Sequence, residues 1–211
     1  MPAHKKIGTI SWTNNLAYAV GLITTDGNLS KDGRHLDFIS NDIGLIETFK
    51  KCLGIKNQVS KKRSGYTGLL SGYHVQFGNV VMHRWLCAIG LMPNKSKLLK
   101  EINIPDEFLF HFLRGHLDGD GSIRKYYDPI YPKSLRLYVS FMSASLPHLL
   151  WIKEKILKLI NIEGFIRKEP RVYELTYSKK NSIKLLSYLY PNANIPRLER
   201  KFLIVKEFIN Y

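Results

Sequence analysis

The chain has 211 residues, with 32 Lys and Arg against 17 Asp and Glu, and therefore a formal net charge of +15. Hydrophobic residues make up 45% of it, which is enough to build a substantial core and excludes a disordered basic tail. No apolar run approaches the ~18 residues of a membrane span, no signal peptide is visible, and two cysteines are too few for a disulfide scaffold. We therefore expect an intracellular protein, in the cytoplasm or an organelle and not secreted, that binds a polyanion, nucleic acid before an anionic membrane surface.

The sequence contains an internal repeat with a period of about 94 residues. AVGLITTDGNLSK in the first half aligns without gaps on LRGHLDGDGSIRK in the second, and the matched residues are Gly21 and Gly115, Asp26 and Asp120, and Gly27 and Gly121. The likeness continues through an amphipathic helix, a basic β-rich stretch and a short helix in each half. We therefore predict an α+β fold of two pseudo-twofold-related α-β-β-α-β-β-α repeats, each with a four-stranded antiparallel sheet. The expected bounds are 1–92 for the N-terminal repeat, 93–105 for a polar, basic linker and 106–211 for the C-terminal repeat.

A helix begins each repeat, over about 14–25 in the first and 106–119 in the second. Asn14 or Asn15 is the expected N-cap of the first helix, and Pro105 gives the second a rigid entry. Alternating or β-branched and aromatic residues predict strands within 33–40, 71–79, 134–142 and 171–177.

Small residues on the two leading helices predict a close helix pair. Ala17, Ala19 and Gly21 crowd the first helix, and Gly115 and Gly119 lie on the second. Each helix is followed by a Gly, which suits a left-handed helix end.

Parallel packing of these helices would bring Asp26 and Asp120 together at their C-terminal ends. Like charges repel there, and the helix dipoles add negative character. A divalent cation resolves the conflict, because Mg²⁺ prefers hard oxygen ligands. A lone Asp-Gly is an ordinary turn, but two at matched positions of a repeat indicate a site. Asp118, whose counterpart is Thr24, is expected to be a supporting polar group at the helix end.

The segments AVGLITTDG and LRGHLDGDG resemble the two signature helices of LAGLIDADG homing endonucleases in their single-chain, two-motif form. The resemblance covers nearly the whole chain, and the first motif departs from the pattern only in Thr24 and Thr25 before the acid. It implies a monomeric, site-specific double-strand DNA endonuclease with a long asymmetric target, encoded in an intron or a free-standing mobile element. Such an enzyme hydrolyses one phosphodiester per strand across the minor groove and leaves short 3′ overhangs. The implied cofactor is Mg²⁺, with Mn²⁺ as a substitute and Ca²⁺ supporting binding without cleavage.

The resemblance also implies the site residues. Asp26 and Asp120 would bind metal, with the backbone of Thr25 and Gly119 as further candidate ligands. Family members place a basic residue near the end of each repeat; Lys201 matches in the second repeat, and Lys95 or Lys97 in the first. Asn41 fits a polar site position whose second-half counterpart is Ser143 or Ala144, so the two strands are expected to be cleaved unequally.

The strands of each sheet are expected to read DNA in the major groove, with every second side chain facing the bases. Arg and Gln suit bidentate base contacts, whereas the Lys residues and Arg63 suit phosphates. The candidates in the first half are Asn28, Ser30, Arg34, His35, Asp37, Lys61, Lys62, Arg63, Tyr73, His74 and Gln76. Those in the second half are Ser122, Arg124, Lys125, Tyr126, Arg136, Tyr138, Arg167, Lys168, Arg171, Tyr173 and Glu174.

Two alternatives remain open from the sequence. An RNA-binding maturase that assists splicing of a host intron would use the same scaffold and the same basic surface. A non-catalytic DNA-binding regulator could descend from an endonuclease, although such decay is expected first in the two acids, and both are intact.

Overall fold

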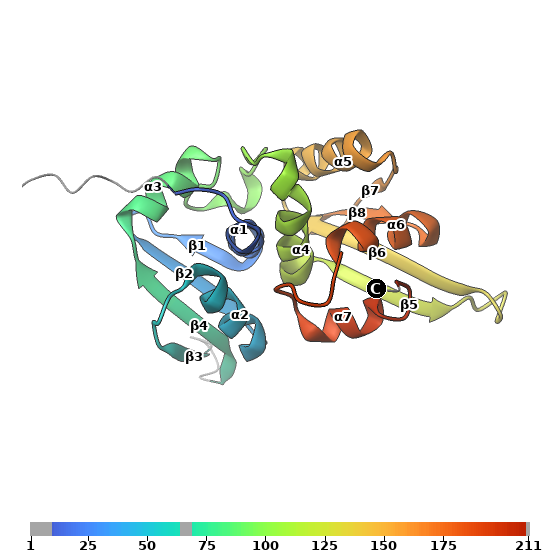
Figure 1. Cartoon of the computed structure of the whole chain (residues 1–211), viewed down its shortest axis with the longest axis horizontal. Coiled ribbons are helices and arrows are strands. Elements are labelled where there is room, and N and C mark those ends of the chain that lie inside the picture. Colours follow the sequence, from blue (N-terminus) through green and yellow to red (C-terminus); the bar gives the residue numbers. More distant parts are fainter. Residues whose placement is uncertain (1–9, 64–68, 210–211) are drawn as a thin grey trace, which may run out of the picture.

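The computed structural model describes residues 10–63 and 69–209, and it has the predicted architecture of two α-β-β-α-β-β-α repeats (Figure 1). The elements of the first repeat are α1 (Asn14–Asp26), β1 (Gly27–Leu29), β2 (His35–Ser40), α2 (Ile43–Leu53), β3 (Val59–Arg63), β4 (Leu70–Gly78) and α3 (Val80–Ala88). The elements of the second repeat are α4 (Leu109–Asp120), β5 (Ser122–Tyr127), β6 (Leu135–Ser143), α5 (Leu146–Ile160), β7 (Phe165–Lys168), β8 (Tyr173–Tyr177), α6 (Lys179–Leu189) and α7 (Glu199–Val205).

Each repeat contains one four-stranded antiparallel sheet, in the order β1-β2-β4-β3 in the first and β5-β6-β8-β7 in the second. The identical strand orders confirm the predicted fold class. The two sheets lie on either side of the α1–α4 pair (Figure 1). Among the described residues, no helix has the length and apolarity needed to cross a membrane.

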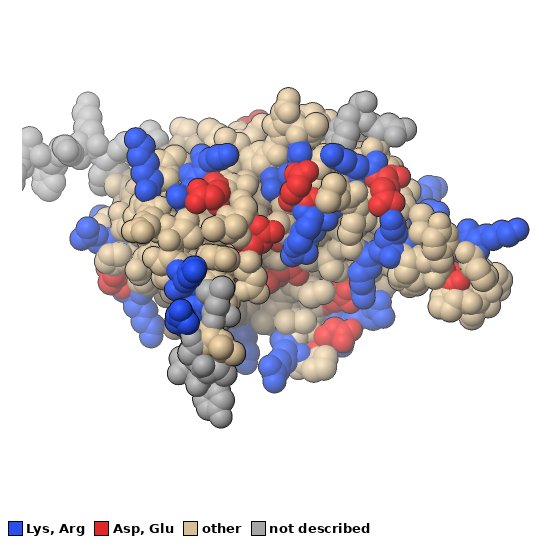
Figure 2. Space-filling view, turned by 90° about the horizontal axis from the view of Figure 1, so that it is seen from below, with Lys and Arg blue, Asp and Glu red and all other residues tan. Residues whose placement is uncertain are grey.

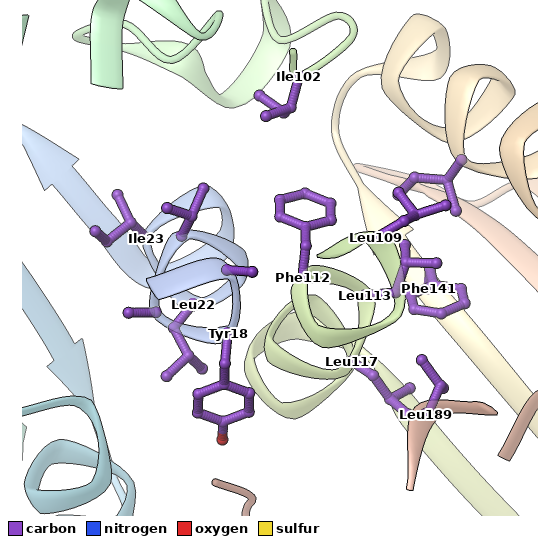
Figure 3. Close-up of a cluster of buried hydrophobic side chains, with 14 of the residues drawn as sticks. Tyr18, Leu22, Ile23, Ile102, Leu109, Phe112, Leu113, Leu117, Phe141 and Leu189 are labelled. Carbon is purple, nitrogen blue, oxygen red and sulfur yellow. The ribbon is translucent and has the colours of Figure 1, made fainter. Parts of the chain in front are cut away.

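Helices α1 and α4 pack with their backbones in contact. A Cβ added at Gly21 would lie 2.1 Å from the carbonyl oxygen of Phe112, and one added at Gly115 would lie 2.1 Å from that of Tyr18. Figure 3 shows the two helices side by side in this apolar centre. Every residue of α1 from 16 to 24 is buried, as expected for a helix enclosed on all sides. The close helix pair predicted from the small residues is therefore present.

Two local expectations about these helices were wrong. Thr13, one residue before the two asparagines, is the N-cap of α1, and its hydroxyl accepts a hydrogen bond from the Leu16 N–H at 3.1 Å. Gly27 and Gly121 have φ values of −84° and −85°, so neither helix ends in the left-handed region. Glycine is required at both positions for lack of space instead, because the chain turns directly from helix into strand after α1 and after α4. A Cβ at Gly27 would lie 2.6 Å from the Cα of Ile23.

The connection between the repeats contributes to the core. A short 3-10 helix, η1 (Lys95–Lys97), lies within it, and a second one, η2 (Asp106–Phe108), leads into α4. Leu99, Ile102 and Ile104 of this segment are buried. Its backbone also forms hydrogen bonds with the end of the first repeat and with the start of α5 in the second. The expected bounds of linker and repeats stay a prediction, but the connection packs against both halves rather than spanning them as a free tether.

Candidate active site and DNA-facing surface

The last residues of α1 and α4 are Asp26 and Asp120, and the two helix ends touch. A Cβ at Gly119 would lie 2.0 Å from the hydroxyl oxygen of Thr25 and 2.9 Å from Oδ2 of Asp26. Because the helices run parallel in matched register, both carboxylates lie at the same end of the helix pair.

The environment of the two carboxylates disfavours their charge. Burial, and then the neighbouring charge of Asp120, raise the pKa of Asp26 to about 6. Burial likewise raises the pKa of Asp120. In both cases Lys95 and Lys201 oppose the rise. The site therefore holds two carboxylates and two buried lysines; Asp26 is half-buried, whereas Asp120 also reaches solvent.

The two lysines are bound by backbone carbonyls in a related way. Lys95, on η1, donates a hydrogen bond to the carbonyl of Gly27, the residue after Asp26. Lys201, on α7, donates to the carbonyl of Gly121, the residue after Asp120, at 2.7 Å. Burial lowers the pKa of each lysine to about 8, and the carboxylates oppose the shift. Lys97 is exposed on the same short helix as Lys95 and has no corresponding buried position.

A cleft lies beside each carboxylate. The Asp26 cleft, of about 580 Å³, is lined by Asp26, Ser40, Asn41, Tyr73, Gly119 and Arg200, among others. The Asp120 cleft, of about 270 Å³, is lined by Asp120, Thr25, Ser96, Ser143 and Ala144, among others. Each cleft is lined by the end of one sheet and by the leading helix of the other repeat. A residue next to one of the two lysines, Arg200 or Ser96, completes the lining. Asn41 lies in the first cleft, and its predicted counterparts Ser143 and Ala144 lie in the second.

Asp118 has a larger structural role than its sequence position suggested. Its carboxylate accepts hydrogen bonds from the Tyr18 hydroxyl at 2.8 Å, the Tyr190 hydroxyl at 3.1 Å and the Leu198 N–H at 2.7 Å. Its backbone carbonyl also accepts from Lys201 at 3.1 Å. Asp118 therefore joins α1, α4, the end of α6 and the start of α7 next to the site. The sequence carried no signal for this role, because the two tyrosines come from distant segments.

Strand register decides which of the predicted DNA-contacting residues face away from the helices. Residues paired with core positions face the helices, and their sequence neighbours face the other way. The helix-free faces of the two sheets carry Asn28, His35, Asp37, Lys62, His74, Gln76, Ser122, Arg124, Tyr126, Arg136, Tyr138, Arg167 and Glu174. The turns between strands carry Ser30, Arg34 and Arg171, and Arg63 follows a register shift at the end of β3.

Five predicted DNA contacts lie on the helix side instead: Lys61, Tyr73, Lys125, Lys168 and Tyr173. Lys125 shows the consequence, since it forms an ion pair with Glu207 after α7, at 2.6 Å. These five residues were assigned to the wrong face because side chains alternate along a strand, and an error of one residue in the register moves every side chain to the other face. The sequence alone did not fix that register.

Several basic residues of the sheets are paired with acids. Arg124 contacts Glu174 at 2.7 Å, Arg136 contacts Asp128 at 2.7 Å and His74 contacts Asp37 at 3.0 Å. Figure 2, which views the molecule from below Figure 1, shows acidic side chains interspersed among the basic ones. On this side of the molecule the basic side chains therefore do not form a purely basic patch.

The fold and its central helix pair define a class of structure, the two-repeat LAGLIDADG fold, and this chain has it. The protein is similar to the meganuclease I-AabMI bound to uncleaved DNA, with 15% identity, a TM-score of 0.62, and coverage of 90% of this chain and 87% of that one. It is similar to I-DmoI in complex with DNA and Ca, with 14% identity, a TM-score of 0.58, and coverage of 90% and 96%. It is also similar to the N-terminal LAGLIDADG domain of DUF199/WhiA, with 13% identity, a TM-score of 0.57, and coverage of 92% and 90%. No protein-family model and no curated protein matches the sequence.

Proposed function

We propose that this protein is a site-specific, divalent-metal-dependent double-strand DNA endonuclease that cuts one phosphodiester per strand across the minor groove and leaves short 3′ overhangs. The observation that carries the proposal is the pair Asp26 and Asp120 at the touching ends of α1 and α4, with a buried lysine on each side. A structural role does not account for this arrangement, because two like charges held side by side at the C-terminal ends of two helices cost stability.

The donor set at this point fits Mg²⁺. Mg²⁺ is commonly held by one or two carboxylates, with waters and substrate phosphates completing its octahedron. Asp26 and Asp120 would supply the carboxylates, with backbone oxygens of Thr25 and Gly119 nearby. Among the described residues no cluster of three or more His, Cys, Asp or Glu side chains offers an all-protein cage. A bound divalent cation would supply Lewis-acid stabilisation of the charge that develops during phosphodiester hydrolysis.

Lys95 and Lys201 would stabilise negative charge at the two scissile phosphates. The carbonyls of Gly27 and Gly121 fix their ammonium groups before substrate arrives. Charges fixed in this way need no reorganisation during the reaction, which is the basis of electrostatic catalysis. With pKa values lowered to about 8 by burial, both lysines can also exchange protons near neutral pH.

The pseudo-twofold symmetry matches a duplex with two antiparallel strands. One cleft beside each carboxylate provides room for one scissile group, and Asn41 adds an amide to the Asp26 cleft only. The helix-free faces of the sheets would hold the flanking DNA, with exposed lysines such as Lys62 on phosphates. Structures of the same fold bound to DNA, including that of I-AabMI, support DNA as the partner.

The test uses a library of randomised duplexes incubated with the protein and Mg²⁺, followed by sequencing of the cut ends. Asp26→Asn and Asp120→Asn should each lower double-strand cleavage by at least about 100-fold, with target binding in Ca²⁺ largely retained. The matched control is Glu154→Gln, which removes an exposed carboxylate of α5 and should leave cleavage unchanged. Full cleavage by both aspartate variants would exclude the proposed mechanism.

A DNA-binding protein without nuclease activity is the second candidate. The observation that favours it is the similarity over 92% of the chain to the LAGLIDADG domain of DUF199/WhiA, a protein that is not named as a nuclease. The same library separates the two. Enrichment of bound sequences in Ca²⁺ without cut ends in Mg²⁺ or Mn²⁺ would establish the second candidate.

A further inference from the structure

Arg124 and Glu174 form an ion pair across the helix-free face of the second sheet. Arg124 lies on β5 and Glu174 on β8, two strands that are separated by β6. Nη2 of Arg124 lies 2.7 Å from Oε1 of Glu174 and 3.5 Å from the hydroxyl of Ser140 on β6. The pair therefore fixes the guanidinium above the middle of the sheet.

The two partners differ in exposure. The Glu174 side chain is 7% exposed and the Arg124 side chain is 49% exposed. A buried carboxylate needs its partner, because an unpaired buried charge is costly. The contacts that the described residues make with Arg124 all involve Nη2, and its Nε and Nη1 donors are not used in them. Glu174 thus takes one N–H of Nη2. Because the Ser140 contact is long, the second N–H of Nη2 can pair with Nε or Nη1, so one edge of the guanidinium still offers a two-donor fork.

The other cations of the helix-free faces are arranged differently. Arg136 uses both Nε and Nη2 on Asp128 in the strand-connecting turn, so its Nε/Nη2 donor pair is already engaged. Lys62 is exposed on the edge strand β3 and suits a phosphate as a mobile point charge. In the first repeat Ser30 stands at the position equivalent to Arg124, and the carboxylate pair there joins Asp37 to His74.

We propose that Arg124 reads a guanine in the major groove of one half-site and that Glu174 is its positioning residue. Guanine presents two acceptors, O6 and N7, that match the fork of an arginine, and this is the commonest specific base contact. A guanidinium held in advance loses less conformational freedom on binding. The inference rests on the proposed DNA-binding function and adds to it a guanine requirement in one half of the target only, because the first repeat has a serine at the equivalent position.

The experiment selects bound sequences from a randomised duplex library in Ca²⁺ and compares the base preference at every position between variants. The wild type should show a position in one half-site with strong guanine preference. Arg124→Lys should lower that preference by about 10-fold or more and leave the other positions unchanged. Glu174→Gln, with Arg124 intact, should lower it by a smaller factor at the same position. Lys62→Ala is the control and should weaken binding to all sequences alike.

The outcomes separate the inference from the proposed function. A uniform loss of affinity in Arg124→Lys would assign Arg124 to a phosphate, and an unchanged profile with unchanged affinity would show that it does not contact the DNA; either result would overturn the inference. A loss of base preference at one guanine only would support the inference, whether or not the protein cuts DNA. Failure of the wild type to cut DNA in Mg²⁺ would overturn only the nuclease proposal. If no sequence is enriched by the wild type, both are overturned. Thermal melting of each variant verifies that it is folded.

Discussion

The two repeats share one backbone plan but support their halves of the central site in different ways. In the first repeat Lys95 lies on a short 3-10 helix and donates to one carbonyl, that of Gly27. In the second repeat Lys201 lies on α7 and donates to the carbonyls of Leu117, Asp118 and Gly121. The duplicated fold has thus kept the placement of its charged groups while the surrounding contacts have diverged.

The same divergence appears in the polar groups next to the site. Asp118 accepts hydrogen bonds from three donors, whereas Thr24, at the equivalent position of α1, donates to the Val20 carbonyl within its own helix, at 2.7 Å. Conversely, the Asp26 cleft contains Asn41, and the Asp120 cleft contains Ser143 and Ala144 in its place. Each repeat has therefore one supporting group that the other lacks.

The largest expected effect concerns Asp118. Asp118→Ala removes the acceptor of the Tyr18 hydroxyl and the Leu198 N–H, both buried, and should lower the free energy of unfolding by about 3 kcal/mol or more. Thr24→Ala removes one hydrogen bond within a helix and should cost about 1 kcal/mol. Urea denaturation of both variants measures the difference. Equal losses would show that the two positions are equivalent after all.

The second prediction uses the raised pKa of Asp26. This pKa is about 6 in the folded protein, against an ordinary value of 3.8 for an aspartate in an unfolded chain. The folded state therefore binds the proton more tightly, and ionisation of Asp26 lowers stability as pH rises from about 4 to about 6. Asp26→Asn removes that penalty, so at about pH 7.5 the variant should be more stable than the wild type by about 1–2 kcal/mol. The gain should vanish below about pH 4, where Asp26 is protonated in both states, and urea denaturation at several pH values is the measurement.

Asp32→Asn is the matched control, because it is expected to change stability in the opposite direction to Asp26→Asn. Hydrogen bonds from His35 and from the backbone N–H groups of His35 and Arg34 lower the pKa of Asp32, so its ionised form stabilises the folded state at neutral pH. Its substitution should therefore reduce stability rather than increase it. A stability gain in both variants, or a gain for Asp26→Asn that persists at about pH 3.5, would contradict the assignment of the shift to burial and to Asp120.

The smallest expected effect concerns Asn41. If its amide assists one strand only, Asn41→Ala should slow nicking of one strand by about 10-fold relative to the other. This is less than the roughly 100-fold or greater loss expected for a donor aimed directly at the developing charge, because Asn41 lies in the cleft wall. Ala144→Asn would supply an amide to the opposite cleft and should reduce the difference between the strands. Strand-specific labelling of a cloned target provides the measurement. Equal nicking rates in wild type and both variants would remove Asn41 from the site.

Much of the fold and the centre of the site could be predicted from the sequence. The aligned glycines predicted the contact between α1 and α4. Two parallel helices in matched register end at the same place, so this contact also predicted that Asp26 and Asp120 lie together. The two four-stranded antiparallel sheets were also predicted from the repeat, whereas the order of their strands came from the structure. These features depend on local patterns and on one symmetry, and both are visible in the chain itself.

Other features depend on contacts between segments far apart in the sequence, and only the tertiary structure decided them. Lys95 rather than Lys97 is buried at the site because η1 directs it toward the end of α1, a geometry that no local pattern encodes. Strand register determines that the Lys125 side chain points toward the helices. The role of Asp118 depends on Tyr18 and Tyr190, which lie 100 and 72 residues away in the sequence. The sequence by itself thus determined the duplicated fold and its pair of acids. Packing determined which cations and polar groups support them, because register and burial arise only when distant strands and helices meet.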